Sequence, residues 1–163
     1  MLLNTLSKQQ IVDLQSLFNR GSMNILNNCV KGVDSLADFQ SVAVAFGVIT
    51  KACLPNIDTG LGKTLIAAGI MNVLRASKPK LRWVYLCQCG NLKTTADKLS
   101  SYLYNANLVY CDSTEAEILR TFLSRRAANA DVLVLSYEAI VQPEVEGFLF
   151  KNRDIFQGIF LDE

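Results

Sequence analysis

The chain contains no histidine, and this absence excludes zinc sites that combine cysteine with histidine. It has five cysteines, an odd number, and no two of them form a C-x-x-C pair. Metal sites built from cysteine alone usually carry such paired spacings, so a cysteine-only site is disfavoured. Cys53, Cys87 and Cys111 lie in apolar runs. This placement is typical of free core thiols in a reducing compartment.

The chain also lacks a long apolar run and a large excess of charge. Residues 1–6 have no basic segment, so they do not resemble a secretory signal. The longest apolar stretch, residues 42–57, is interrupted by Lys51 and Pro55 and is too short to span a bilayer. The net charge of +1 neither favours nor excludes nucleic acid as a partner. We therefore expect an intracellular protein, cytoplasmic or nuclear, with no membrane partner.

What the chain does contain is an alternation of helical and strand-like patterns. Its 163 residues, half of them hydrophobic, suffice for one domain with a substantial core. The patterns predict helices at residues 7–19, 35–47, 65–76, 92–104, 114–128 and on either side of Pro143 within 137–150, and strands at 49–57, 83–87, 108–111, 132–135 and 158–163. The helix at 114–128 should be capped by Ser113 or Thr114. Strands that alternate with helices predict an α/β fold with a parallel sheet and right-handed crossovers.

A glycine turn at residues 58–64, followed by an apolar run, is the most informative motif. Glycines let successive backbone N–H groups face one anion, and the positive end of the following helix dipole adds to this. Lys63 can reach the β- and γ-phosphates of a nucleotide, and the Thr64 hydroxyl can ligate Mg²⁺. The match to the pattern G-x-x-x-x-G-K-[ST] is incomplete, because Ile57 stands where the first glycine belongs. Gly60 supplies the flexibility instead. The alternative is an ordinary glycine turn that caps a helix.

A second nucleotide-hydrolase signature ends the chain, about a hundred residues after the turn. Four apolar residues, 158–161 with Gly158 at their start, precede Asp162 and Glu163. An aspartate at the end of a buried strand can hold Mg²⁺ through water, and the adjacent glutamate can orient and deprotonate the attacking water. Ligands of parallel sheets bind beyond the carboxyl ends of the strands, where both signatures are expected. The alternative is an apolar strand that merely ends in surface acids.

Four stretches together resemble the first motor domain of superfamily 2 helicases and translocases, most closely the Swi/Snf-type branch. Leu36-Ala37-Asp38-Phe39-Gln40 resembles the segment L-x-x-[YF]-Q, whose glutamine reads adenine. Asp58 to Thr64 resembles the loop D-E-x-G-L-G-K-T. Residues 134–138 resemble the T-S-Y-E segment beside the nucleic-acid track, and residues 160–163 resemble the start of the D-E-A-H box. The resemblance covers residues 36 to 163.

The resemblance implies a complete set of site residues. Catalysis would fall to Lys63, Asp162 and Glu163, and Mg²⁺ would be held by Thr64 and Asp162. ATP would be bound by Gln40, Asp58, Thr59, Gly60, Leu61, Gly62, Lys63 and Thr64. Nucleic acid would contact Gly90, Asn91, Ser136 and Tyr137. The chain departs from the branch at Ile57–Asp58, where the branch has Asp-Glu, and at residues 88–91, where the family usually has a proline and a hydroxyl residue.

The resemblance also implies a domain layout and an activity. Residues 1–33 would form an N-terminal helical extension, and residues 34–163 a truncated first RecA-like, P-loop NTPase lobe, incomplete at its C-terminus. We expect the chain to be a fragment, because the coupling motifs and the second RecA-like lobe do not follow. Alone it should hydrolyse ATP negligibly, since that lobe would supply the arginine that stabilises the transition state. The intact protein would move along nucleic acid, DNA rather than RNA, without efficient strand separation.

Two other interpretations fit the same motifs. The chain could be a P-loop ATPase of another class, such as a packaging or partition motor, and a Gln40 that does not contact adenine would favour this. It could also be a non-catalytic nucleotide-binding or assembly module. The basic residues Lys78, Lys80 and Arg82 are more typical of a solvated loop than of a phosphate track.

Overall fold

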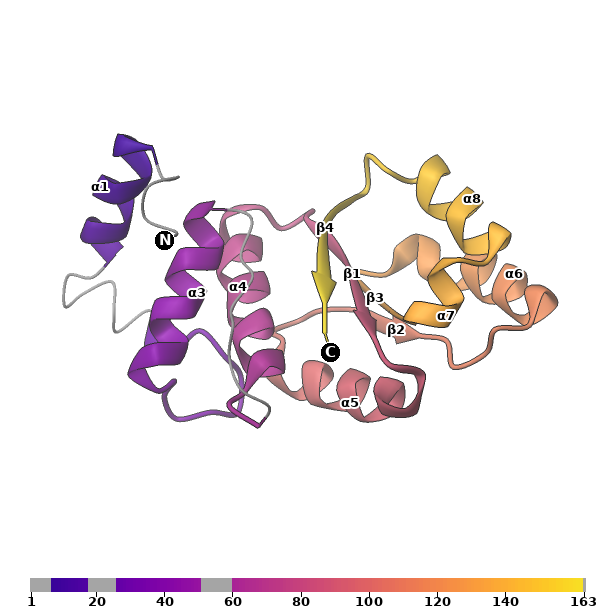
Figure 1. The fold of residues 1–163 in the computed structure, drawn as a ribbon, viewed down its shortest axis with the longest axis horizontal. Helices are drawn as coiled ribbons and strands as arrows, with labels where there is room; N and C mark the ends of the chain where they lie inside the picture. The colour runs from indigo at the N-terminus through magenta and orange to yellow at the C-terminus, as the bar shows by residue number, and fades with distance from the viewer. Residues whose placement is uncertain (1–6, 18–25, 51–59, 163) are drawn as a thin grey trace. The chain divides into compact units, whose positions relative to one another are not determined.

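The structure, a computed structural model, describes residues 7–17, 26–50 and 60–162, and it divides the chain into two compact units. The first unit comprises residues 1–77 together with 102–104 (Figure 1). The second comprises residues 78–101 and 105–163. The sequence-predicted boundary near residue 33 stays a prediction.

The first unit is helical in its described part. Its helices are α1 (Lys8–Leu17), α3 (Asp38–Thr50) and α4 (Lys63–Ser77). Helices α3 and α4 pack against each other, and α1 contacts α3. A Cβ atom added at Gly69 of α4 would lie 2.7 Å from Cγ2 of Val44 in α3. Glycine at this position therefore lets the two helices approach closely.

The second unit contains a four-stranded, all-parallel sheet. Its strands are β1 (Arg82–Cys87), β2 (Leu108–Tyr110), β3 (Val132–Ser136) and β4 (Phe156–Leu161), in the order β2-β3-β1-β4. Every residue of β3 is buried, as expected for a parallel strand covered on both faces. The α/β class with a parallel sheet, predicted from the sequence, is confirmed.

Helices cover both faces of this sheet. Helices α6 (Ala116–Arg125), α7 (Tyr137–Ile140) and α8 (Pro143–Lys151) pack on the face that carries Val84 and Leu86 of β1 (Figure 1). On the opposite face, α5 (Leu92–Tyr102) places Thr95 within hydrogen-bond reach of the Cys87 thiol of β1. Short 3₁₀ turns at Cys89–Asn91 and Ala127–Asn129 complete the connections. The two faces of β1 therefore belong to different helical layers.

Two local expectations are wrong and one is confirmed. The strand expected at 49–57 fails at Ile49 and Thr50, which belong to α3; the rest of it lies outside the described residues. Helical burial of Ser41, Val44 and Ala45 continues the helix through this apolar run. The predicted cap of α6 also fails, because Ser113 accepts a hydrogen bond from the N–H of Glu115, before the helix begins. Pro143 starts α8, as its missing N–H favours.

Gly158 in β4 is required by the tryptophan beside it. Trp83 of β1 pairs with Gly158 in the parallel register, after an irregularity between Arg82 and Trp83. A Cβ atom added at Gly158 would lie 1.8 Å from Cε3 of Trp83, so the ring occupies the space that any side chain would need. The same ring packs against Phe160, with 5.2 Å between the ring centroids. Only glycine fits at this register position.

We predict that Gly158→Ala destabilises the second unit by about 1–3 kcal/mol, because the buried ring must shift to admit the methyl group. The measurement is urea unfolding followed by the fluorescence of Trp83, which is the only tryptophan of the chain. Gly147→Ala in α8 is the matched control, since an added Cβ meets no atom within 4 Å there. Alanine in a helix interior should stabilise by roughly 0.5–1 kcal/mol. Equal unfolding midpoints for Gly158→Ala and the parent would contradict the packing argument.

Candidate functional site

The glycine turn has the backbone conformation that its composition predicts. Gly60 and Gly62 both have φ of +89°, in the left-handed region that strongly favours glycine. Lys63 follows as the first residue of α4, so the turn opens directly into a helix. The first N–H groups of any helix have no partner within the helix itself. Helix starts of this kind are common anion-binding positions in proteins.

Helix α4 holds this turn on a packed scaffold. Six consecutive residues, Ile66 to Met71, are buried in the 15-residue helix. The first intrahelical bond runs from the N–H of Ile66 to the carbonyl of Gly62, at 3.0 Å. Further along, the Asn72 amide donates to the carbonyls of Cys29 and Tyr102, at 2.9 Å each. The helix that carries Lys63 and Thr64 is therefore fixed along its length.

Gln40 contacts the turn directly. Its Nε2 donates to the carbonyl of Leu61 at 3.0 Å, and its Oε1 accepts from the N–H of Ala37, also at 3.0 Å. A Cβ atom at Gly62 would lie 2.6 Å from the same Nε2 atom, so a side chain at Gly62 would displace the amide. The structure thus brings together Gln40 and the loop, which the sequence assigned to one site. The bond from the N–H of Ala37 also has capping-box geometry at the start of α3.

Asp162 lies just beyond β4 and is hydrogen-bonded at three points. Its N–H donates to the carbonyl of Leu86 at 2.8 Å. Its Oδ2 accepts from the hydroxyl of Tyr85 at 2.8 Å, and its carbonyl accepts from the hydroxyl of Tyr137. The sequence predicted Asp162 as a site residue and placed Tyr85 only within the strand at 83–87. The signal for Tyr85 is the parallel register of β1 and β4, which sequence periodicity alone does not specify.

The residues predicted to face nucleic acid follow β1 and β3. Gly90 and Asn91 are exposed in the turn after β1. Ser136 ends β3 and is buried, and its hydroxyl accepts from the N–H of Ala139 at 3.1 Å. Ser136 is therefore the cap of α7, and Tyr137 is bonded to Asp162. Because β3, β1 and β4 are neighbours in a parallel sheet, these residues and Asp162 follow the carboxyl ends of adjacent strands.

Four of the cysteines lie within the described residues. Among the residues that the structure describes, no three histidine, cysteine, aspartate or glutamate side chains cluster as a metal site would require. Cys29, Cys87, Cys89 and Cys111 are free thiols. Burial raises the pKa of the Cys29 thiol to about 11, and burial likewise raises the pKa values of Cys87 and Cys111. Cys89 is exposed.

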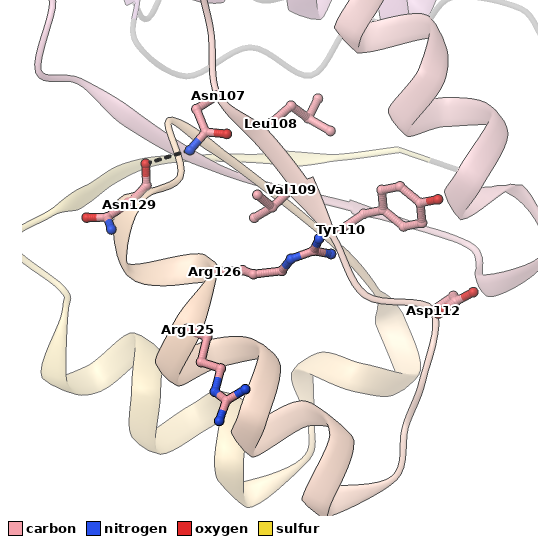
Figure 2. Close-up of a pocket in the computed structure, with 8 residues that line it drawn as sticks. All are labelled: Asn107, Leu108, Val109, Tyr110, Asp112, Arg125, Arg126 and Asn129. Carbon is pink, nitrogen blue, oxygen red and sulfur yellow. Dashed lines mark hydrogen bonds between the residues drawn. The ribbon is translucent and has the colours of Figure 1, made fainter.

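A hollow of about 640 Å³ lies in the second unit, and none of the predicted site residues is among those that line it. It borders the edge strand β2 and the end of α6, and its lining residues are Asn107, Leu108, Val109, Tyr110, Asp112, Arg125, Arg126 and Asn129 (Figure 2). Figure 2 shows Arg126 extending toward β2, whereas Arg125 points away from the strand. The Asn107 amide bridges to the carbonyl of Asn129 at 3.0 Å. The two guanidinium groups do not converge on one point.

The predicted residues fall into two groups. The first unit contains Gln40, Gly60, Leu61, Gly62, Lys63 and Thr64. The second unit contains Gly90, Asn91, Ser136, Tyr137 and Asp162. Asp58, Thr59 and Glu163 lie outside the described residues.

Comparison with models of known protein families gives no match for the chain, and no curated protein sequence matches it. Within the described part, none of the helices is both long and apolar enough to cross a membrane.

Proposed function

We propose that the chain is the ATP-binding first lobe of an ATP-dependent nucleic-acid motor, a helicase or translocase. The observation that carries this proposal is the glycine turn. Gly60 and Gly62 adopt the left-handed conformation directly before Lys63 and Thr64, at the start of a buried helix. A turn that only ended a helix would need one such glycine after the helix, whereas this turn has two before one. The all-parallel sheet of the second unit is compatible with a RecA-like fold.

In this proposal the first unit binds the nucleotide. Backbone N–H groups of residues 60–64 would hold the phosphates, and the Lys63 ammonium would balance the charge of the β- and γ-phosphates. The resemblance also assigns Asp58 and Thr59 to ATP binding. Gln40 would contact adenine, and it already holds the loop through Leu61. Reading adenine would require its amide to exchange one of its present partners.

The residues present fit a magnesium ion of the kind that accompanies ATP. Mg²⁺ in such sites is usually bound by one or two carboxylates together with phosphates and water, rather than by a protein cage. Asp162 offers one partly buried, oriented carboxylate, and the described residues contain no larger cluster. The resemblance assigns Thr64 and Asp162 to this ion, which when bound would neutralise charge on the phosphates. Glu163 would orient and deprotonate the attacking water.

The carboxyl ends of β1 and β3 are the proposed nucleic-acid surface. Gly90 and Asn91 are exposed there, and a small or amide residue lets a phosphate approach the backbone closely. Ser136 is buried as a helix cap, so its contribution would be to shape this edge rather than to touch phosphate. We propose duplex DNA as the partner because residues 60–64 and 135–138 resemble the Swi/Snf-type branch.

One observation favours a second candidate function. Both ends of the Gln40 amide are bonded to the protein, at Ala37 and Leu61, which suits a structural glutamine better than one that reads a base. A P-loop ATPase of another class, such as a packaging or partition motor, would use the same loop without that contact.

We predict that Lys63→Ala weakens the binding of Mg-ADP by about 10- to 100-fold, because a charge-assisted hydrogen bond contributes about 1.5–3 kcal/mol. Isothermal titration calorimetry of the chain against the parent measures this. Lys31→Ala is the matched control, since Lys31 is an exposed lysine of the same unit. Equal affinity of the Lys63→Ala variant and the parent would remove the central claim.

We predict that Gln40→Ala lowers the preference for ATP over GTP. An amide donates to and accepts from the adenine edge together, whereas guanine presents the opposite pattern. Loss of the hydrogen bond to Leu61 should weaken the binding of both nucleotides. The ratio of the two dissociation constants is therefore the informative quantity. An equal loss of affinity for ATP and for GTP would favour the second candidate function.

We predict that the chain binds duplex DNA with little sequence preference and that binding weakens steeply with salt, through release of counterions. Fluorescence anisotropy with two unrelated duplexes over a salt series measures both properties. Asn91→Asp should weaken binding several-fold, because it adds a negative charge at the proposed surface. Asn129→Asp adds the same charge to an exposed residue of the same unit outside that surface and should have little effect. Equal effects of the two variants, or no binding, would contradict the proposed surface.

A further inference from the structure

Three polar groups of Asp162, its N–H, its carbonyl and its carboxylate, are hydrogen-bonded to residues of β1 and α7. Its N–H is bonded to β1 through the Leu86 carbonyl, at 2.8 Å. Its carboxylate is bonded to β1 through the Tyr85 hydroxyl, also at 2.8 Å. Its carbonyl accepts from Tyr137, the residue that follows β3. The main chain and the side chain of Asp162 are thus fixed separately.

Tyr85 is itself held rigidly. Only 2% of its surface is exposed, and it lies in the middle of a strand that is paired on both sides. Its ring stacks on Phe160, with 6.1 Å between centroids and 24° between the ring planes. The ring therefore has little freedom to move, and its hydroxyl presents a donor at a fixed point. A carboxylate that accepts one such bond keeps lone pairs for further ligands.

Tyr137 is fixed from a different element. It is the first residue of α7, and the hydroxyl of Ser136 caps that short helix through the N–H of Ala139. Its ring is partly buried against the core that underlies α6 to α8. A phenol from the end of β3 and a phenol from the middle of β1 therefore meet one residue at the end of β4.

We propose that Tyr85 and Tyr137 are positioning residues for Asp162, which set the direction of its carboxylate before Mg²⁺ binds. This inference rests on the proposed function. Neither tyrosine needs to touch the metal or the nucleotide, because each acts through Asp162. Tyr85 fixes the carboxylate, and Tyr137 fixes the main chain that carries it. Mutation of a residue that orients a metal ligand in this way typically lowers the affinity for the metal by about 10- to 100-fold.

The test is the affinity of the chain for Mn²⁺ in the presence of saturating ADP, measured by electron paramagnetic resonance of the free ion. Tyr85→Phe removes one hydroxyl and keeps the ring, so it should weaken Mn²⁺ binding by about 10-fold. Tyr137→Phe should weaken binding in the same direction. Affinity for ADP without metal should stay unchanged in both variants.

Tyr110→Phe is the matched control, because it removes a tyrosine hydroxyl from β2, a strand of the same sheet that does not contact Asp162. A second control combines Tyr85→Phe with Asp162→Asn. If Tyr85 acts through Asp162, the double variant should bind Mn²⁺ no more weakly than Asp162→Asn alone. Trp83 fluorescence reports whether each variant remains folded.

The outcomes separate the two claims. If the parent binds neither ADP nor Mn²⁺, the proposed function fails and the positioning role for a metal ligand fails with it. If the parent binds both and Asp162→Asn binds Mn²⁺ more weakly, while Tyr85→Phe behaves as Tyr110→Phe does, the positioning role alone is overturned. Additive losses of Mn²⁺ affinity in the double variant would also overturn the positioning role, because Tyr85 would then act independently of Asp162.

Discussion

Parallel pairing in the order β3-β1-β4 is the constraint on which the candidate residues of the second unit depend. Parallel strands end on the same edge of a sheet, so Tyr137, Asn91 and Asp162 follow neighbouring strand ends. The hydrogen bond between Tyr85 and Asp162 requires the observed register of β1 and β4. A shift of one residue would turn Tyr85 to the opposite face and end that contact. The single glycine that admits Trp83 fixes the same register from the other end of the strand pair.

In the first unit, glycine conformation and helix packing position the candidate residues, rather than strand register. Two glycines give the loop a shape that other residues rarely adopt, and the packed helix α4 fixes the place where the loop ends. Gln40 then joins the start of α3 to the loop through the two hydrogen bonds of its side-chain amide. Any ligand at the loop would meet a backbone that is already held in position. Preorganisation of this kind reduces the entropy lost when a ligand binds.

Two residues expected to touch ligands are also structural. Ser136 caps α7, and Gln40 completes the cap of α3. Short polar side chains near strand ends and helix starts serve readily as caps, because the first N–H groups of a helix need acceptors. A motif resemblance identifies such residues by position and type, and does not distinguish a cap from a ligand contact. Nucleotide-selectivity measurements on Gln40 variants address this distinction directly.

The sequence by itself determined the alternation of helices and strands in the second unit, the parallel class of the sheet and the glycine turn. These features depend on local properties: hydrophobic period, β-branched content and the backbone freedom of glycine. It misplaced the end of α3, where the apolar run continues the helix, and the cap of α6, where Ser113 bonds to Glu115 before the helix begins. Only the tertiary structure decided that Tyr85 and Tyr137 bond to Asp162, that Gln40 holds Leu61 and that Trp83 excludes a side chain at Gly158. Most of these partners are far apart in the sequence, and the register and packing that join them are collective properties of the folded chain.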